Sequence, residues 1–262
     1  MTLLDMDLTG RMALVTASTS GIGLATSEGL AKLGASVWMN GRNAERLDAA
    51  AAIVRERIPG ADVHTAVGDV ATVEGVRAVT DTVVDLDILI NMAGGTDRVV
   101  PFMELTDEDW QYQWDFNVMS GVRLCRHYVP LLQQKDYGRI IFMTSEAGIV
   151  TPPDVVDYGV CKAAVIRLSR CIAEIFARTN VTVNCVAPGP TISDWLYRVA
   201  NGKPLDEFAK EFLPVAQPTS LFDRFAEADE VANLILYLCS PASAATRGAL
   251  LRAEGGSIRT NS

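Results

Sequence analysis

The chain has 262 residues, with 23 basic and 32 acidic side chains that give a formal net charge of −9. Hydrophobic residues make up 49% of it and charged residues 21%, a composition typical of a folded protein with a deep core. The acidic balance disfavours proteins that work by neutralising nucleic acid or anionic lipid, so we expect neither as a partner.

The first 67 residues predict a strand–helix–strand–helix–strand unit. Short apolar runs rich in β-formers predict the strands, and apolar residues at helical spacing predict the helices. In chain order these are a strand at 11–16, a helix at 21–33, a strand at 36–40, a helix at 43–58 and a strand at 62–67. Gly34 and Pro59 stand where the two helices should end.

The alternation of strands and helices continues along the rest of the chain. The further elements are a helix at 72–84, a strand at 88–91, a helix at 106–132, a strand at 139–144, a helix at 158–178, a strand at 181–186, a helix at 227–238 and a strand at 249–251. Such alternation requires a parallel sheet with helices on both faces. We therefore predict an α/β fold, a doubly wound parallel sheet of seven strands (Rossmann fold), in a single domain over residues 1–262.

Residues 191–220 interrupt this rhythm. They carry two short helix-like pieces, at 193–200 and 205–212, and no predicted strand. An insertion of this length after the carboxyl end of a strand usually covers a site, so we predict that it caps the substrate.

The stretch VTASTSGIG, residues 15–23, lies between the first strand and the first helix and predicts a nucleotide loop. Gly21 and Gly23 would let backbone N–H groups and a helix N-terminus approach a pyrophosphate, which a Cβ would obstruct. Ala17 stands where a glycine is usual. We expect it to be tolerated, because the position demands smallness rather than a positive φ. The alternative is a turn that only packs a helix against a sheet.

Hydroxyl groups surround those glycines, from Thr16, Ser18 and Ser20, and are expected to bond the loop or the phosphates. At the end of the second strand the sequence reads Asn40-Gly41-Arg42. A site specific for NAD would place a carboxylate there for the ribose 2′-hydroxyl, whereas a 2′-phosphate calls for a cation. Arg42 therefore favours NADP.

Three polar residues near the middle of the chain predict carbonyl chemistry. Tyr158 and Lys162 are four residues apart, so both project from one helical face. We expect the ammonium group to lower the pKa of the phenol, which is ordinarily about 10. Ser145, at the end of a predicted strand, can donate a hydrogen bond to a carbonyl oxygen that gains charge.

Together with further motifs, these residues resemble those of the short-chain dehydrogenase/reductase family. In order, the motifs are TASTSGIG at 16–23 for the TGxxxGxG loop, Gly68-Asp69-Val70, Asn91-Met92-Ala93-Gly94 for the NNAG turn, Asn117, Ser145, the YxxxK pair Tyr158 and Lys162, Pro188-Gly189-Pro190-Thr191, and Glu254-Gly255-Gly256. The resemblance covers essentially the whole chain. Ala17 and Met92 depart from the family pattern.

The resemblance implies a role for each catalytic residue. Tyr158 would exchange the proton with the substrate oxygen, and Ser145 would orient that oxygen. Lys162 would hold the nicotinamide ribose, and Asn117 would support a water-linked proton path towards it.

The resemblance also implies a cofactor site drawn from several segments. Its residues are Thr16, Ser18, Ser20, Gly21 and Ile22 of the first loop, Arg42, Asp69, Val70, Asn91, Ala93, Gly94, Tyr158, Lys162, Pro188, Gly189 and Thr191. Members that bind NADP often carry a basic residue where Ser20 stands, so NAD remains the alternative cofactor. A homotetramer or homodimer is the assembly that the resemblance suggests.

Segments 94–100, 147–156 and 191–196 are expected to face the substrate. They are mainly apolar, Trp195 and Leu196 included, and favour an apolar ketone or secondary alcohol. The nearest alternative is a 3-oxoacyl-[acyl-carrier-protein] reductase, and a remote one is a non-catalytic dinucleotide sensor. Glu146, beside Ser145, is equally compatible with facing the site and facing solvent.

The cysteines and histidines predict no metal or disulfide chemistry. The five cysteines are odd in number, widely spaced and form no CxxC motif. His64 and His127 have no second ligand at metal spacing. We therefore expect a protein of the reducing cytoplasm without a metal site. The sequence has no apolar stretch of 18 residues, so we expect no membrane span either.

Overall fold

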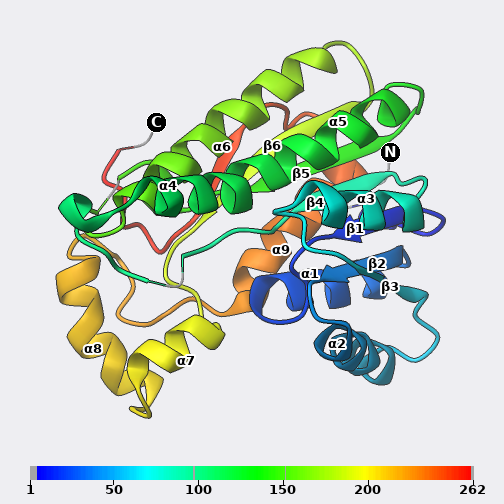
Figure 1. The fold of residues 1–262 in the computed structure, drawn as a ribbon. Helices are drawn as coiled ribbons and strands as arrows, with labels where there is room; N and C mark the ends of the chain where they lie inside the picture. The colour runs from blue at the N-terminus through cyan, green and yellow to red at the C-terminus, as the bar shows by residue number, and fades with distance from the viewer. Residues whose placement is uncertain (1–4, 97, 151, 261–262) are drawn as a thin grey trace.

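This computed structural model describes residues 5–96, 98–150 and 152–260, and within them seven strands form one sheet in the order β3-β2-β1-β4-β5-β6-β7 (Figure 1). All neighbouring strands are parallel. The strands are β1 Met12–Val15, β2 Ser36–Gly41, β3 Val63–Val67, β4 Ile88–Asn91, β5 Gly138–Met143, β6 Val181–Pro188 and β7 Leu250–Ala253. The predicted doubly wound α/β fold is confirmed.

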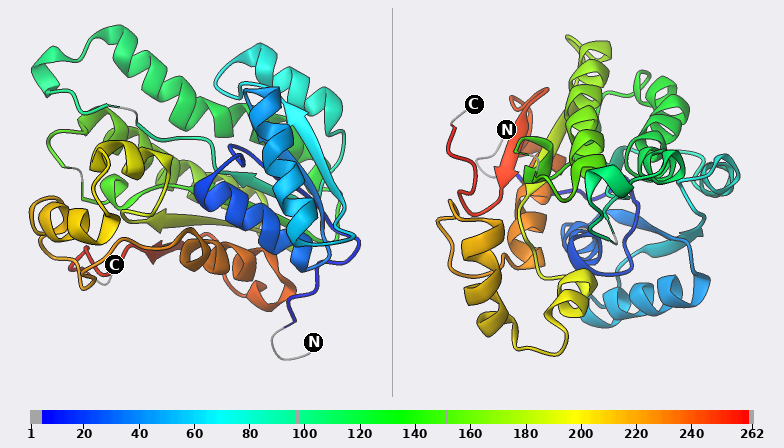
Figure 2. Two further views of the ribbon diagram at one scale, coloured as in Figure 1. Left: turned by 90° about the horizontal axis from the view of Figure 1, so that it is seen from below. Right: turned by 60° about the vertical axis from the view of Figure 1, so that its left-hand side comes forward.

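Helices cover both faces of the sheet, as Figures 1 and 2 show. They are α1 Gly21–Lys32, α2 Ala44–Arg57, α3 Val73–Thr82, α4 Asp107–Trp114, α5 Ser120–Leu132, α6 Val156–Ile175, α7 Asp194–Ala200, α8 Leu205–Ala216 and α9 Ala228–Cys239. One core lies between the sheet and α1, α2 and α9, and another between the sheet and α3, α5 and α6. With both faces covered, the central strands are buried along their whole length: every residue of β4 and β5 is buried, and all of them except Asn91 and Arg139 are apolar or glycine.

The predicted helix at 106–132 is interrupted. Between α4 and α5, residues Asp115–Met119 form a π-helical turn, in which Ser120 N–H bonds the carbonyl of Asp115. Other differences are small: α6 begins two residues earlier than predicted and ends at Ile175, and β7 runs to Ala253. These shifts lie at element ends, where a sequence pattern defines boundaries poorly.

The reversal of strand order places a site at the carboxyl edge of the sheet. From β1 the chain moves outward to β2 and β3, then crosses back to β4 on the other side of β1. The connections after β1 and β4 therefore diverge, and ligands of open α/β sheets bind at such a switch point.

Helices α7 and α8 extend beyond this carboxyl edge (Figures 1 and 2). They pack on each other through a small core of their own, made by Leu196, Ala209, Leu213 and Phe225. Leu196 is fully buried in that core, so the prediction that it faces the substrate is wrong.

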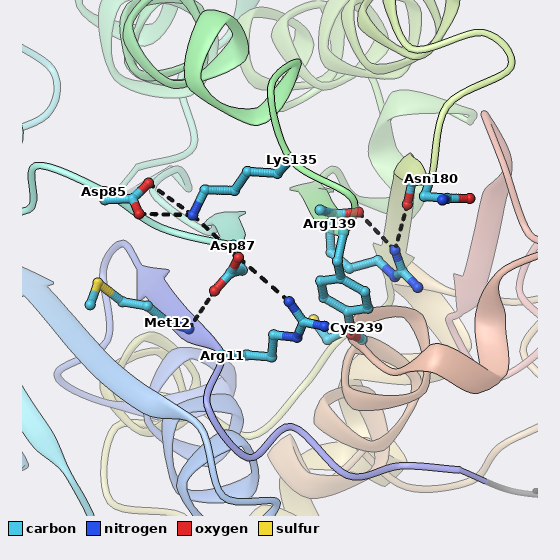
Figure 3. A network of polar contacts seen from close by, with 10 residues as sticks. Arg11, Met12, Asp85, Asp87, Lys135, Arg139, Asn180 and Cys239 are labelled. Atoms are coloured by element: carbon cyan, nitrogen blue, oxygen red, sulfur yellow. Dashed lines mark hydrogen bonds and ion pairs between the residues drawn. The ribbon is translucent and has the colours of Figure 1, made fainter. Parts of the chain in front are cut away.

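The opposite, amino edge of the sheet is tied by polar contacts (Figure 3). Asp87, just before β4, accepts the N–H of Met12 at the start of β1, at 3.0 Å. Its carboxylate also lies 3.3 Å from Lys135 Nζ and 3.8 Å from the guanidinium of Arg11. This network joins the starts of two neighbouring strands and lies away from the carboxyl edge.

Candidate active site

The loop after β1 is a tight turn that depends on small residues. Gly21 has φ +53°, and a Cβ on Gly23 would overlap the backbone of Ala17 and Ser18. Ala17 itself has φ 50°, in the left-handed region. The expectation that this position does not need a positive φ is therefore wrong. The turn demands glycine-like backbone freedom, and Ala17 adopts the conformation at a cost in strain.

Two of the three loop hydroxyl groups, those of Thr16 and Ser18, hold the loop against neighbouring parts of the sheet, whereas that of Ser20 makes no capping bond. Thr16 Oγ1 accepts the N–H groups of Met92 and Ala93, both at 2.9 Å, and so ties the end of β1 to the segment after β4. Ser18 Oγ accepts the N–H of Asn40 at 2.9 Å and ties the loop to β2. The side chain of Ser20, the N-cap of α1, makes no capping bond.

The N-terminus of α1 is consequently open. It carries no acidic residue in its first turn and no side-chain cap. Unpaired N–H groups and the positive end of the helix dipole together bind anions such as phosphate. A Cβ on Gly21 would be 3.8 Å from Ser193 of the cap, so the cap begins beside this turn. Ile22 packs on the core beneath the loop rather than towards the N–H groups.

The end of β2 presents a cation and no carboxylate. Asn40 is buried, and its Nδ2 donates to the carbonyls of Ala66 at 2.9 Å and Gly68 at 3.0 Å. Arg42 is exposed, with its guanidinium carbon 5.9 Å from the centre of the Phe116 ring. The guanidinium therefore stays accessible to an anion at the strand end.

Predicted cofactor residues also line the ends of β3, β4 and β6. Asp69 Oδ1 accepts the N–H of Ala71 at 3.0 Å, which shapes the turn before α3. Of the other residues at these strand ends, Val70, Asn91 and Ala93 are buried, and Pro188, Gly189 and Thr191 are partly exposed. Gly189 packs so closely on Glu254 that a Cβ would lie 2.9 Å from its backbone, which keeps β6 and β7 together here.

Gly94 brings two distant functional residues together. A Cβ on it would lie 2.5 Å from Lys162 Nζ and 2.7 Å from Asn117 Oδ1, so only glycine fits between them. Asn117 sits in the π-helical turn, where its Oδ1 accepts the N–H of Gly95 at 2.8 Å. Its Nδ2 donates to Gln113 Oε1 at 2.6 Å. Gln113, which could not be predicted from the sequence, thus orients the Asn117 amide together with the backbone of Gly95.

The strand β5 and the first turns of α6 place Ser145, Tyr158 and Lys162 side by side. Ser145 follows β5, and Tyr158 and Lys162 lie one helical turn apart, with Nζ 5.5 Å from the centre of the phenol ring. Lys162 is buried, and its Nζ donates to the carbonyl of Met143 at 3.1 Å. The predicted proximity of the two side chains is confirmed.

The predicted electrostatic effect of that proximity is wrong. Burial and the neighbouring Glu146 carboxylate raise the pKa of Tyr158 well above its usual value, and a hydrogen bond from Ser145 only partly opposes them. Burial lowers the pKa of Lys162 to about 8. The groups that shift the pKa of the phenol are the buried surroundings, Glu146 and Ser145, while the Lys162 ammonium group bonds the carbonyl of Met143.

Glu146 faces the site, which settles an alternative that the sequence left open. Its Oε2 accepts the hydroxyl of Ser145 at 2.6 Å, and its Oε1 accepts Gln217 Nε2 at 3.1 Å. Burial, joined by the charge of Glu254, raises the pKa of Glu146. Gln217 follows α8, and no local pattern marks it, because its contact spans 71 positions of the chain.

Some predicted features lie outside the site or outside the described residues. Of the segments expected to face the substrate, Asp97 and Thr151 fall outside the described residues. His64 stacks on Trp38 and pairs with Asp62 at the far edge of the sheet, and His127 contacts Tyr128 on α5. Across 5–96, 98–150 and 152–260, no group of three potential metal ligands is present. Within the same ranges no helix has the length and apolarity needed to cross a membrane.

The residues of the carboxyl edge fit a dinucleotide. The open N-terminus of α1 suits a pyrophosphate, the cation at Arg42 suits a 2′-phosphate, and the absence of a side chain at Gly94 leaves Lys162 room.

Comparisons with known proteins point the same way. The family model described as "Enoyl-(Acyl carrier protein) reductase" matches residues 16–257. The chain is 40% identical to the uncharacterized oxidoreductase YvrD of Bacillus subtilis over 98% of this chain and 100% of that protein. It is 36% identical to a 3-oxoacyl-[acyl-carrier-protein] reductase of Synechocystis, over 96% and 98% respectively. The L-sorbose reductase of Gluconobacter frateurii, solved with NADPH and L-sorbose, superposes with a TM-score of 0.90 at 35% identity, covering 98% of this chain and 100% of that one.

Proposed function

Because this chain belongs to the short-chain dehydrogenase/reductase family, we propose that it is an NADP-preferring carbonyl reductase, which converts a ketone into a secondary alcohol. The comparisons show that the chain is an oxidoreductase of this family. The observation that carries the proposed carbonyl reduction is the grouping of Ser145, Tyr158 and Lys162 at the carboxyl edge of the sheet, where β5 ends and α6 begins.

The cofactor residues support NADP. When bound, the nicotinamide supplies the hydride that reduces the carbonyl carbon, or takes it up in the reverse reaction. Arg42 at the end of β2 is exposed, and the side chain before it that could reach a ribose is the amide Asn40. A guanidinium pairs well with a phosphate, and no carboxylate opposes it there. The L-sorbose reductase, to which this chain is similar, was solved with NADPH.

The protein's own side chains divide the work of reduction. Tyr158 donates its hydroxyl proton to the substrate oxygen, and Ser145 donates a hydrogen bond to that oxygen as it gains charge. Lys162 and Asn117 lie on either side of Gly94. Lys162 holds the nicotinamide ribose, and Asn117 supports a water-linked path along which protons reach Lys162. Since burial keeps Tyr158 protonated, the site is suited to act as an acid, which is the role that ketone reduction needs.

The substrate is proposed to be mainly apolar and to bind under the cap, residues 191–220. Trp195 and Ile192 lie at the base of the cap, partly buried against its core. The second candidate is a 3-oxoacyl-[acyl-carrier-protein] reductase, which the Synechocystis relative favours.

Oxidation of NADPH with a panel of ketones tests the proposal. The panel contains acetophenone as the apolar ketone, a 3-oxobutanoyl thioester of N-acetylcysteamine and L-sorbose, each with NADPH and with NADH. We expect the highest kcat/KM for acetophenone with NADPH. Preference for the thioester would replace the substrate assignment with the second candidate, and a preference for NADH would overturn the cofactor assignment.

Substitution of Tyr158 separates an enzyme from a dinucleotide sensor. Tyr158→Phe removes the proton donor and keeps the ring, so kcat should fall at least about 100-fold. The Kd for NADPH, measured by quenching of protein fluorescence, should stay within about threefold of wild type. Cys161→Ala, on the same helix and packed in the core, is the control for damage to α6. Unchanged turnover in Tyr158→Phe would leave the sensor as the better assignment.

We also propose an assembly state and a cellular compartment for the protein. Phe102, Met103, Tyr112 and Trp114, in and before α4, are all exposed, which supports burial of this region in a homotetramer or homodimer. All five cysteines are free, which supports a reducing cytoplasm. Light scattering after size-exclusion chromatography tests the assembly, and a monomer would contradict it.

A further inference from the structure

Ser145 has a single hydroxyl hydrogen, and two groups compete for it: the Glu146 carboxylate and the Tyr158 hydroxyl. Ser145 Oγ lies 2.6 Å from Glu146 Oε2, while the N–H of Ala147 donates to the same Oγ at 3.2 Å. An ionised carboxylate is a stronger acceptor than a carbonyl oxygen. As long as Glu146 is ionised, Ser145 has no hydrogen left to give to a substrate.

The two oxygens of the Glu146 carboxyl group have different neighbours. Oε1 faces an amide N–H of Gln217, at 3.1 Å, and can only accept from it. Oε2 faces a hydroxyl, which can either donate or accept. A neutral carboxyl group matches this pattern: its C=O is directed at Gln217 and its O–H at Ser145.

The groups around Glu146 favour that neutral form. Tyr158 faces it from α6, and Glu254 from the segment after β7, while α8 contributes the uncharged amide of Gln217. Glu254 is itself 3.5 Å from Arg252, and the cation on α6, Lys162, donates to the carbonyl of Met143. Burial, joined by the charge of Glu254, raises the pKa of Glu146 above its ordinary 4.5, although hydrogen bonds from Ser145 and from the backbone N–H groups of Glu146 and Ala147 act in the opposite direction.

We propose that Glu146 is a positioning residue whose neutral carboxyl group donates its O–H to Ser145 Oγ and thereby frees the Ser145 hydrogen for the substrate oxygen. The inference rests on the proposed function, because it concerns the hydrogen bond that Ser145 gives during ketone reduction. Gln217 fixes which carboxyl oxygen carries the hydrogen, so the cap takes part in preparing Ser145.

The proposal makes reduction depend on the ionisation of Glu146. As the pH rises through the pKa of Glu146, the carboxylate that forms accepts the Ser145 hydrogen. Ser145 can then no longer donate to the substrate oxygen, and kcat falls. Glu146→Gln mimics the neutral acid, because its amide can donate to Ser145 and accept from Gln217 but cannot ionise. Glu146→Ala provides neither, and should lower kcat about 10-fold, a part of the effect of losing one oxyanion donor.

The kinetic test compares pH profiles for NADPH oxidation, with acetophenone, the thioester or L-sorbose, whichever gives the highest kcat/KM. Lys162, whose pKa lies at about 8, titrates in the same profile, so the readout is the difference between wild type and Glu146→Gln. Wild type should lose kcat at a lower pH than Glu146→Gln, with KM unchanged. Glu207→Gln, the same change on the exposed face of α8, should follow wild type.

Identical profiles for wild type and Glu146→Gln would overturn the proposal. A Glu146→Gln protein as impaired as Glu146→Ala would do so as well, since it would show that the carboxylate is the active form. A raised KM at unchanged kcat in Glu146→Gln would also contradict it, because Glu146 would then bind the substrate itself.

Infrared spectroscopy tests the inference without cofactor or substrate. The C=O stretch of a neutral carboxyl group should persist well above pH 4.5, disappear in Glu146→Gln and shift in Ser145→Ala, which removes the acceptor of its O–H. A carboxyl group that ionises at its ordinary pH refutes the inference even if ketones are reduced. Conversely, if no ketone is reduced, the proposed function is wrong, but the infrared measurement still tests whether Glu146 is neutral.

Discussion

The backbone of Ala17 shows how one methyl group changes the energetics of a loop. Its φ of 50° is costly for any residue with a Cβ, by roughly 1–2 kcal/mol. Its side chain is exposed, so removing it opens no cavity. The family pattern places a glycine here, and this chain keeps the same backbone without one.

Ala17→Gly should therefore stabilise the protein. Relief of the left-handed strain outweighs the extra chain entropy of glycine in the unfolded state, for a net gain of about 1 kcal/mol in the free energy of unfolding. Urea denaturation of the cofactor-free protein measures it. Ala49→Gly, on the exposed face of α2, is the matched control and should lose about 1 kcal/mol. Equal losses in both variants would contradict the prediction.

The raised pKa of Tyr158 gives the two directions of the reaction different pH dependences. Alcohol oxidation needs the phenolate as base, and burial and Glu146 keep the phenol protonated. The oxidation rate should rise with pH, by about tenfold per pH unit, at least to the ordinary tyrosine value of about 10. NADPH formation from 1-phenylethanol measures it, and a rate that levels off near neutral pH would contradict the prediction.

At the scale of the element, the π-helical turn Asp115–Met119 matters because it carries Asn117. π-turns inside α-helices occur often at functional sites. The sequence predicts one unbroken helix here, since the apolar spacing on both sides is helical and no residue type marks a π-turn. The hydrogen bond between Asn117 and Gln113, which depends on this turn, could not be predicted from the sequence either.

Gln113→Leu should loosen the Asn117 amide. The side chain is almost completely buried, and it accepts from Asn117 and donates to Thr96, so its loss leaves polar groups unpaired. We expect kcat to fall about 10-fold with little change in KM, as for a lost positioning contact. Gln111→Leu, on the exposed face of α4, is the control. A fall in KM and kcat together would indicate a different role.

At the scale of the whole molecule, the Asp87 network and the proposed catalytic residues lie at opposite edges of the sheet. The Asp87 network lies at the amino edge (Figure 3). Ser145, Tyr158 and Lys162 lie at the carboxyl edge, where β5 ends and α6 begins. Variants at the amino edge should therefore change the free energy of unfolding and not the kinetics.

Asp87→Ala should lower the free energy of unfolding by about 2 kcal/mol, because it leaves Met12 N–H and Lys135 without their partly buried acceptor. Asp85, which pairs with the same lysine from an exposed position, is the control, and Asp85→Ala should cost less than about 0.5 kcal/mol. Urea denaturation measures both, and the kcat/KM of the folded variants should match wild type. A kinetic defect in Asp87→Ala would contradict the separation of edges.

Most of the fold could be predicted from the sequence, because buried parallel strands such as β4 and β5 are short apolar runs between amphipathic helices. The YxxxK pair could be predicted as well, since its spacing is local. The contact between Glu146 and Gln217 could not, because it depends on where the cap packs. The pKa of Tyr158 was predicted in the wrong direction for the same reason: burial is a property of the assembled fold.

The ion pair between Arg46 of α2 and Asp194 of α7, at 3.1 Å, joins the cap to helix α2. Both side chains are mostly exposed, so the pair contributes less than about 1 kcal/mol and dissolved electrolyte screens it. At low ionic strength the ion pair would hold the cap against α2, and at high ionic strength this contact would be weakened. Rates of product release would then vary with ionic strength, while the proton-transfer groups beneath are unaffected.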